Sequence, residues 1–438
     1  MSRELTKDVM VGAGKRKKKW STASKIIAAV VFVIVVVVVG IVIRYTSSFN
    51  NFLDKITAKT PEMKSYSVVV LNNSEIQQVA GLAGKSVGFL KIDEKAGNAE
   101  KYLEDIVRIS PEFYDDVDTL TGVLNGKIVD AITIETDRLE MLKDDANDTI
   151  KDTRVIYDFK IEIESENAEI AEKEVTKEPF VIYISGSDSR TGIKTTARSD
   201  VNIVAVVNPS KGKILLVSIP RDTYVQLHGT TGIRDKLTHA GVYGINMSKT
   251  TIEDFLGVSI DYTVKVSFDT VVKVVDQIDG IEIDSDQAMT LGSEDGTKCS
   301  YVVGKQQVNG KCALRFARER KSYTTGDRHR GENQMQVITA IISKLTSARN
   351  YLFNIPAILD IAADSFETSF TRDDIVSFIK MQIAGGTKWQ VESVSVTGTG
   401  SMQGTYSMGA SRPLYVMLAD PASVAKVTAK INEYLTNK

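Results

Sequence analysis

The sequence of 438 residues has few of the side chains that build metal centres or thiol chemistry, with only two cysteines and three histidines. Two cysteines cannot complete a tetrahedral zinc site without histidine ligands, and the three histidines show no ligand spacing. No Ser-His-Asp or Cys-His arrangement suggests a covalent enzyme intermediate. These shortages exclude a zinc-held domain and give no support to catalysis through a serine or cysteine nucleophile.

The net charge is also small: it is −2 at pH 7, and the isoelectric point is near 6.1. No global charge therefore draws the chain to nucleic acid, and no helix-turn-helix pattern, repeat or low-complexity tail stands out. Charged residues make up 25% and apolar residues 42%, as in folded proteins, and the length allows two or three domains. Any anion binding must come from local clusters.

One long apolar run, 26–43, carries no charge across about eighteen positions and is long enough to cross a bilayer. It exceeds the ~7–15 residues of a signal-peptide core, and no small-x-small cleavage site follows it. A buried core helix rarely follows a run such as KRKKK. Lysine and arginine gather before the run, so the N-terminus is predicted to be cytoplasmic. The sequence thus predicts a basic tail (1–24), a transmembrane helix (25–45), a stalk (46–64) and extracellular domains, as in a single-pass protein of the cell membrane.

Two α/β regions follow the stalk. The first, 65–166, has no catalytic constellation and is predicted to be an accessory domain with a structural or docking role. A charged segment without an apolar stripe, 167–178, is predicted to be a linker. The second, 179–438, alternates strands with helices, which predicts a mixed central sheet with helices on both faces. In the first region the predicted strands are 65–71, 85–92 and 129–135, and helices are predicted near 75–82, 99–107 and 117–124.

Charged side chains gather beyond the ends of three short Val- and Ile-rich runs between residues 180 and 219. Asp188, Arg198 and Asp200 lie between the first two runs, and Arg221 and Asp222 follow the third. Open α/β sheets bind ligands in a crevice at the strand ends, so these side chains are expected to converge. Two carboxylates beside guanidinium groups suit a divalent cation and a phosphorylated ligand.

A second cluster of charged and polar residues lies on two predicted helices and the loop between them. A helix N-terminus favours anions, and guanidinium groups bind phosphoryl oxygens in a bidentate manner. A solvated basic face is the alternative interpretation of such a charge run. Arg315 and Arg318 share one face of the first helix, and Arg330 and Gln334 share a face of the second. The members of the cluster are Arg315, Arg318, Arg320, Lys321, Asp327, Arg328, His329, Arg330, Asn333 and Gln334.

The only two cysteines, Cys299 and Cys312, lie on the extracellular side of the predicted anchor. That compartment permits disulfides, so a disulfide between them is predicted. Eight apolar residues of the later helices are open to two interpretations: Ile338, Ile341, Ile342, Leu345, Leu352, Ile355, Ile358 and Leu359. They either form ordinary core or line a tunnel for an apolar ligand tail, and the sequence does not separate the two.

Six motifs occur in the order of one known family: GSDSRTG, RSD, SIPRD, DKLTHAGVYG, FARERK and GDRHRGENQ. On these motifs, which span about 179–348, the chain resembles the LytR-CpsA-Psr family of membrane-anchored extracytoplasmic proteins. The resemblance implies a phosphotransferase that moves a glycopolymer, capsular polysaccharide or a teichoic-acid-like chain, from an undecaprenyl-pyrophosphate carrier to peptidoglycan. It implies Mg²⁺ as the cofactor and a membrane lipid as a further partner, with no nucleic acid.

The resemblance also implies roles for individual residues. Asp188 and Asp200 match the acidic pair that binds magnesium, and with Arg221 they form the expected catalytic set. Asp222 and Asp327 are expected to orient their neighbours, with Asp222 as the partner of Arg221. The general base stays open among Asp188, Asp200 and Asp222. The residues expected to bind the pyrophosphate are Arg198, Arg221, Arg318, Arg320, Arg330 and Gln334.

Two other functions compete with the transferase. A non-catalytic receptor for polyprenyl phosphates or cell-wall glycans would use the same basic clusters without turnover. A transcription regulator would need those clusters to meet DNA, from which the predicted membrane separates them.

Overall fold

The computed structural model describes residues 50, 53–54, 57, 61–93, 95–143, 149–163, 173–187, 192–292, 296–324, 326–347, 366–385 and 387–436. The predicted basic tail and transmembrane helix, 1–24 and 25–45, lie outside these ranges, as does most of the predicted stalk. Among the described residues, no helix is both long enough and apolar enough to cross a bilayer. The membrane anchor therefore stays a prediction.

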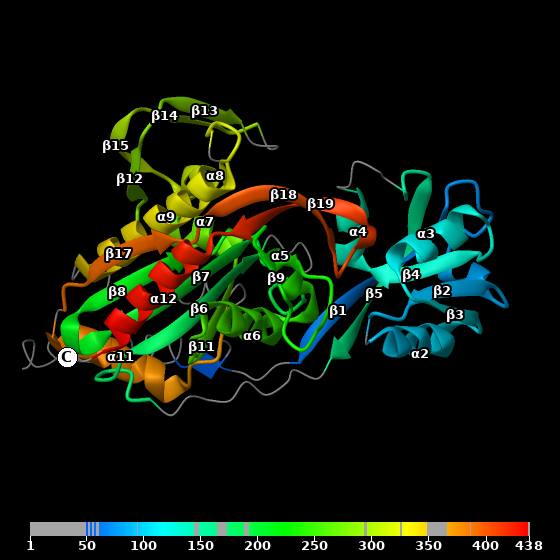
Figure 1. Ribbon diagram of the computed structural model, residues 1–438, viewed down its shortest axis with the longest axis horizontal. Coiled ribbons are helices and arrows are strands. Elements are labelled where there is room, and N and C mark those ends of the chain that lie inside the picture. Colours follow the sequence, from blue (N-terminus) through cyan, green and yellow to red (C-terminus); the bar gives the residue numbers. More distant parts are fainter. Residues whose placement is uncertain are drawn as a thin grey trace, which may run out of the picture. The chain divides into compact units, whose positions relative to one another are not determined.

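The larger of two main sheets has six strands in the order β16-β11-β6-β7-β8-β17 (Figure 1). Strand pairs β6–β11 and β8–β17 are parallel, whereas β6–β7, β7–β8 and β11–β16 are antiparallel. The three predicted Val- and Ile-rich runs form its centre, and every residue of β7 is buried. The predicted mixed sheet is therefore confirmed. Its strands are β6 Phe180–Ser187, β7 Val201–Asn208, β8 Lys213–Ser218, β11 Tyr262–Ser267, β16 Phe366–Thr368 and β17 Gln390–Ser395.

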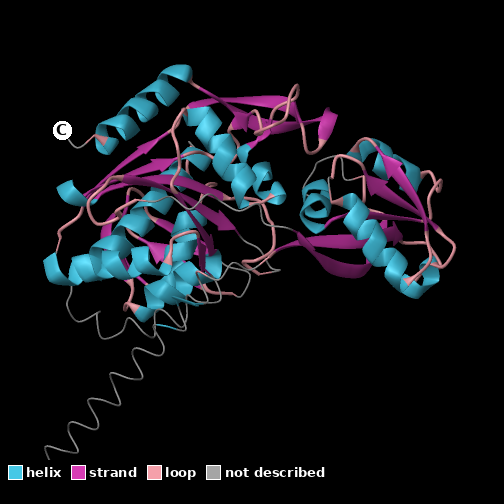
Figure 2. Ribbon diagram, turned by 90° about the horizontal axis from the view of Figure 1, so that it is seen from below, coloured by secondary structure: helices cyan, strands magenta, loops and turns pink. Residues whose placement is uncertain are grey.

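Helices pack on both faces of this sheet (Figure 2). Successive side chains of a strand point to opposite faces, so Val204 and Val206 of β7 join one core while Ile203 and Ala205 join the other. The first core includes residues of α6 and α12, and the second includes residues of α9 and α11. The helices of this region are α5 Leu237–Ala240, α6 Ile245–Leu256, α7 Phe268–Gln277, α8 Gly310–Arg318, α9 Asp327–Ser347, α11 Arg372–Gly385 and α12 Pro421–Leu435.

The smaller sheet has five strands in the order β3-β2-β4-β1-β5 and its own helices. The three strands predicted in this region are present, but β3, β5 and α4 were not predicted. β3 is short and half polar and begins Ser-Pro, which an edge strand tolerates. The helix predicted near 75–82 is wrong except for the short 3₁₀ helix η1. The elements are β1 Glu62–Leu71, η1 Val79–Leu82, β2 Ser86–Leu90, α2 Ala96–Ile106, β3 Ser110–Tyr114, α3 Val117–Asn125, β4 Ala131–Glu135, α4 Thr136–Lys143 and β5 Thr153–Ile163.

Hydrogen bonds join the smaller sheet to the segment that precedes β7. The backbone N–H of Met63 in β1 donates to the carbonyl of Lys194, and that of Thr196 donates to the carbonyl of Met63, both at 2.9 Å. On α4, Arg138 donates to the carbonyl of Ser407 and to the hydroxyl of Tyr243. Residues 51–438 form one compact unit, and the predicted domain boundaries stay a prediction.

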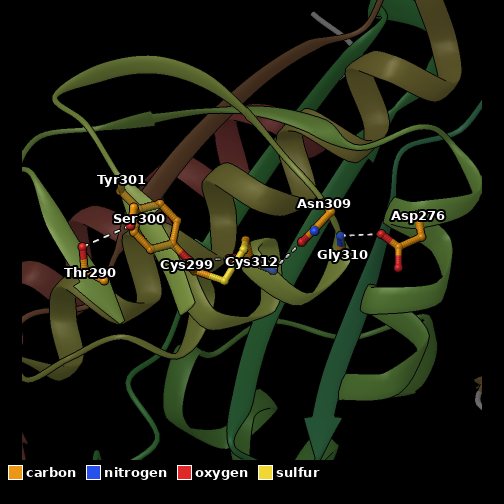
Figure 3. The surroundings of a disulfide bond; sticks show 8 residues. All are labelled: Asp276, Thr290, Cys299, Ser300, Tyr301, Asn309, Gly310 and Cys312. Atoms are coloured by element: carbon orange, nitrogen blue, oxygen red, sulfur yellow. Dashed lines mark hydrogen bonds between the residues drawn. A yellow bond between two sulfur atoms is a disulfide. The ribbon is translucent and has the colours of Figure 1, made fainter. Parts of the chain in front are cut away.

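A disulfide between Cys299 and Cys312 ties β14 to the start of α8, with their Cα atoms 5.5 Å apart (Figure 3). The predicted pairing is confirmed. Asn309 caps α8 by accepting a hydrogen bond from the Cys312 backbone, and Asp276 of α7 accepts one from the Gly310 backbone. These contacts fix the start of α8. The neighbouring hairpin strands are β12 Ile281–Ser285, β13 Met289–Gly292, β14 Lys298–Tyr301 and β15 Gly304–Val308.

A long antiparallel ribbon, which the sequence did not predict, follows β17. It consists of β18 Gly398–Thr405 and β19 Gly409–Ala419, joined by a tight turn that contains Ser407 (Figure 1). Glycine is depleted in strands, so the glycine-rich β18 does not carry the alternating apolar pattern that marks a strand. Two short strands, β9 Tyr224–Val225 and β10 Asp235–Lys236, lie near the ribbon.

Candidate active site

The candidate residues meet because of the directions of the central strands. β7 runs antiparallel to β6 and β8, so the ends of β6 and β8 lie at the same edge as the start of β7. β11 is parallel to β6, and Ser267 at its end pairs with Ser187. Asp200 directly precedes β7, Arg221 follows β8 and Phe268 opens α7. All three therefore lie at one edge of the sheet.

A cavity of about 350 Å³ opens at this edge. Six cationic side chains but only two carboxylates line it, which makes it strongly electropositive. Arg221, Arg318, Arg320, Arg330 and Gln334 all line it together with Asp200, as the sequence predicted. The complete lining is Asp200, Arg221, Phe268, Arg315, Arg318, Glu319, Arg320, Lys321, Arg330 and Gln334.

Asp200 and Arg221 form an ion pair inside the cavity. Nη1 of Arg221 donates to Oδ1 of Asp200 at 2.7 Å, and both side chains are about one-fifth exposed. A carboxylate fixes a guanidinium well because their hydrogen bonds are charge-assisted. Asp200 therefore orients Arg221 within the cavity.

Asp222, which follows Arg221 in the sequence, is buried and is not among the residues that line the cavity. Its Oδ1 accepts a hydrogen bond from Lys236 at 2.9 Å, whereas the Arg221 Nε lies 3.9 Å from its Oδ2. Burial acts to raise the pKa of Asp222, but Lys236, Arg221 and Arg330 outweigh it and hold the pKa below its usual range. The predicted pairing of Asp222 with Arg221 is therefore present as a long ion pair, and Lys236 is a second and closer partner. The burial of Asp222 and these pairings argue against a role as general base.

Arg330 and Gln334 lie one turn apart on α9 and line the cavity together. α9 passes close to the end of β8 at Gly331, where an added Cβ would lie 2.6 Å from the Ser218 hydroxyl. A larger residue at 331 would require the Ser218 hydroxyl to move, so glycine suits this close approach. The neighbouring Arg330 is largely buried and lines the cavity. The adjacent Asn333 donates to the carbonyl of Phe316 at 3.1 Å and so joins α9 to α8.

Three predicted residues are not seen in the cavity. Arg198 is half-buried and is not among the lining residues. Asp188 lies outside the described residues. Asp327 opens α9, but its side chain lies outside the described part of the structure. The roles predicted for these three residues stay predictions.

The cavity also includes Arg315 and Lys321 of the predicted second cluster, together with Glu319 and Phe268, to which the sequence analysis gave no role. The guanidinium of Arg318 lies 5.0 Å from the centre of the Phe268 ring. Helical spacing offered a signal for Arg315, which precedes Arg318 by three positions. Nothing in the sequence marks Phe268, because its proximity depends on the pairing of β11 with β6.

Asp137, on α4 of the smaller sheet, also interacts electrostatically with the loop that precedes β7. Burial raises its pKa to about 7; Glu135 and Asp200 act in the same direction, and Arg198 opposes them. The sequence analysis missed this residue because it lies in the predicted accessory domain, far from the motifs along the chain.

Replacing Asp137 with Asn should change how stability depends on pH. The folded pKa of about 7 exceeds the ordinary value of about 3.9, so the folded state binds the proton more tightly between these values. The free energy of unfolding should therefore fall as the pH rises through this window, and D137N should lessen the fall. Urea unfolding at about pH 4 and pH 8 should show D137N more stable than the wild type only at the higher pH. An equal effect at both values would contradict the prediction.

Three of the four described residues considered for a lipid tunnel pack against cores, and the fourth, Leu345, is 38% exposed. Ile338 and Ile342 pack against the core that includes β7, and Ile341 packs against the core around the disulfide. The residues considered at 352–359 lie outside the described ranges. Ordinary core is thus the interpretation that the described residues support.

The donor set of the cavity suits a phosphorylated ligand. Clustered guanidinium groups favour an anion with several oxygens, such as a diphosphate. No group of three or more His, Cys, Asp or Glu side chains that could hold a metal occurs among the described residues. Mg²⁺, however, commonly binds through one or two carboxylates together with substrate phosphates. Asp200 beside an anion-binding cavity fits that mode.

Residues 143–420 match the LytR_cpsA_psr family. The polyisoprenyl-teichoic acid–peptidoglycan teichoic acid transferase TagU of Bacillus subtilis is 33% identical over 271 residues, which cover 60% of this chain and 81% of that protein. TagU of Enterococcus faecalis is 34% identical over 52% of this chain and 73% of that protein. The crystal structure of B. subtilis TagV matches with a TM-score of 0.50 and 30% identity, covering 59% of this chain and 98% of that one.

Proposed function

The chain belongs to the LytR_cpsA_psr family, and we propose that it is a membrane-anchored transferase that attaches a glycopolymer to peptidoglycan. The donor is the glycopolymer linked through a diphosphate to a polyprenyl carrier. The related TagU and TagV proteins are named as transferases of polyisoprenyl-linked teichoic acid to peptidoglycan. The observation that carries the proposal is the convergence of six cationic side chains with Asp200 in one cavity.

The reaction is a phosphoryl transfer. A sugar hydroxyl of the acceptor attacks the phosphorus next to the glycopolymer, a new P–O bond forms, and the P–O bond to the carrier phosphate breaks. The hydroxyl proton goes to a base, and polyprenyl monophosphate leaves with the bonding electron pair. Negative charge therefore grows on the bridging oxygen, and catalysis depends on positioning and on preorganised positive charge.

We assign different roles in the reaction to the cavity residues according to their burial and contacts. Arg221, held by Asp200, and Arg330, buried against β8, are the two guanidiniums least free to move, so we assign them to the diphosphate. Arg318 and Arg320 are more exposed and extend the positive potential toward the approaching donor. Our candidate to accept the proton is Asp200, because it lines the cavity, and Asp188 is the alternative.

Mg²⁺ would be held by Asp200 and by oxygens of the diphosphate, with Asp188 as the second carboxylate. When bound, it would neutralise the charge that develops on the phosphoryl oxygens. The proposed glycopolymer is a teichoic-acid-like chain, with capsular polysaccharide as the alternative, because related proteins are named as teichoic acid transferases.

The test uses the full chain in proteoliposomes with a labelled glycan on polyprenyl diphosphate and with purified sacculi. We expect label in the sacculi, a loss of transfer on chelation with EDTA and recovery with added Mg²⁺ but not with Na⁺. D200N should lower the rate of transfer and need more Mg²⁺ for its half-maximal value, because it removes both a charged ligand and the proposed base. Donor binding that persists without any transfer, with or without Mg²⁺, would instead identify a receptor.

A further inference from the structure

The ribbon of β18 and β19 exposes an apolar surface beside the cavity. Tyr415 is 52% exposed and Met402, its partner in the strand register, is 60% exposed. Pro413, two residues before Tyr415 on the same side of β19, is also exposed. We call the surface formed by Gly400, Met402, Pro413 and Tyr415 the ribbon face. Exposed apolar surface of this kind marks a site of interaction.

The tyrosine ring lies over a glycine. A Cβ added at Gly400 would lie 2.8 Å from a ring carbon of Tyr415 and 3.1 Å from its hydroxyl oxygen. The ring therefore occupies the space that a side chain at residue 400 would fill. Glycine at this position keeps the ring against the strand, while half of the side chain stays open to solvent.

The ribbon is joined directly to the segment that carries Arg221. The backbone N–H of Met417 donates to the carbonyl of Asp222 at 2.7 Å, and Met417 forms a β-bridge with Thr223. Tyr415 lies two residues along β19 from Met417, about 7 Å at the rise of an antiparallel strand. A chain of several sugar units that lay on the ribbon face would thus lead toward the cavity.

The ribbon face is neutral, in contrast to the cavity. Between residues 398 and 419 the only charged side chain is Arg412, which is buried and pairs with Asp118. The polar side chains of Thr399, Ser401 and Gln403 alternate with Gly400 and Met402 along β18 and lie on the opposite face of the ribbon. A surface with no charge gives no attraction to a polyanion such as a phosphate-linked polymer.

We propose that the ribbon face binds a neutral glycan strand of the acceptor, with the ring of Tyr415 stacked against a sugar. This inference rests on the proposed transferase function. A sugar ring presents C–H groups on one face and hydroxyls around its rim. The negative face of the Tyr415 ring attracts the C–H groups, while the hydroxyls of the rim stay in water. An acceptor strand held in this way would lie next to the segment that carries Arg221.

The test compares variants of the full chain in detergent micelles by co-pelleting with sacculi freed of teichoic acid. Y415S should weaken binding about five- to tenfold, the size of a lost aromatic contact, whereas Y415F should bind like the wild type. G400V should weaken binding too, because its side chain displaces the ring while a β-branched residue suits a strand. V303S is the matched control, since Val303 is 68% exposed on a different hairpin.

The outcomes separate this inference from the proposed function. Transfer to sacculi by the wild type, with unchanged binding and acceptor KM in Y415S, would overturn the inference and leave the function standing. Tyr415-dependent pelleting without any transfer would leave the glycan face standing and overturn the function. A change in oligomeric state of Y415S in light scattering, or equal loss of binding to empty lipid vesicles, would assign the face to a second copy or to a bilayer and overturn the inference.

Discussion

Replacing Arg221 with Ala should lower the rate of glycopolymer transfer by about 10²–10³-fold, as the loss of one preorganised charge-stabilising donor does elsewhere. Arg221 lies in the cavity and is fixed by Asp200 at 2.7 Å, so its charge is in place before the substrate binds. The effect should fall on the chemical step, because the charge that Arg221 meets grows as the carrier phosphate departs. Single-turnover transfer to sacculi, with donor in excess over its dissociation constant, measures this step directly.

Two further variants test whether the effect depends on the guanidinium group of Arg221. R221K keeps the charge but loses the planar guanidinium that pairs with Asp200, so its rate should lie between those of the wild type and R221A. R234A is the matched control, because Arg234 is exposed and is not among the cavity residues. Equal rates for R221A and R234A would refute the assigned role of Arg221.

The centre of the fold and half of the site were predictable because they depend on local signals. Short Val- and Ile-rich runs marked β6, β7 and β8, and charged residues at their ends marked the edge where the cavity opens. Helical spacing likewise brought Arg330 and Gln334 together. Residues that flank the ends of neighbouring strands lie together at the edge of a sheet. The sequence pattern therefore predicted the position of the site without knowledge of the strand order.

Other features depend on contacts between segments that are far apart in sequence. Asp222 pairs with its neighbour Arg221, as predicted, but its closer partner is Lys236, which lies fourteen positions further along the chain. Asp137 interacts with the loop before β7 only because β1 and α4 lie against the catalytic region. The ribbon escaped prediction because glycines interrupt its pattern, although one of those glycines makes room for Tyr415.

Contacts between the two regions depend on charges that are removed from water. Arg138 is fully buried; it donates to Glu135 at 2.5 Å, to the Tyr243 hydroxyl at 3.3 Å and to the carbonyl of Ser407. Lys64 lies 2.5 Å from the other carboxylate oxygen of Glu135. Burial acts to raise the pKa of Glu135, but Arg138 and Lys64 outweigh it and lower the pKa to about 2. Each of these buried charges is therefore stabilised by the others, and removing one would leave another without a partner.

Replacing Arg138 with Met should therefore lower the free energy of unfolding by about 3–5 kcal/mol, the range for breaking a buried ion pair. The loss comes mainly from Glu135, whose buried charge would keep only one of its two cationic partners, and from the unpaired carbonyl of Ser407. Urea unfolding monitored by circular dichroism measures the change.

Lys143 provides the matched control, because it lies on the same helix in a surface pair with Glu140. K143M should cost no more than about 1 kcal/mol, since exposed ion pairs contribute little. The charge-balanced double variant E135Q/R138M should recover part of the loss, because it removes the stranded carboxylate together with its partner. If R138M and K143M cost the same, or if the double variant is the least stable of the three, the buried charges do not hold the two regions together.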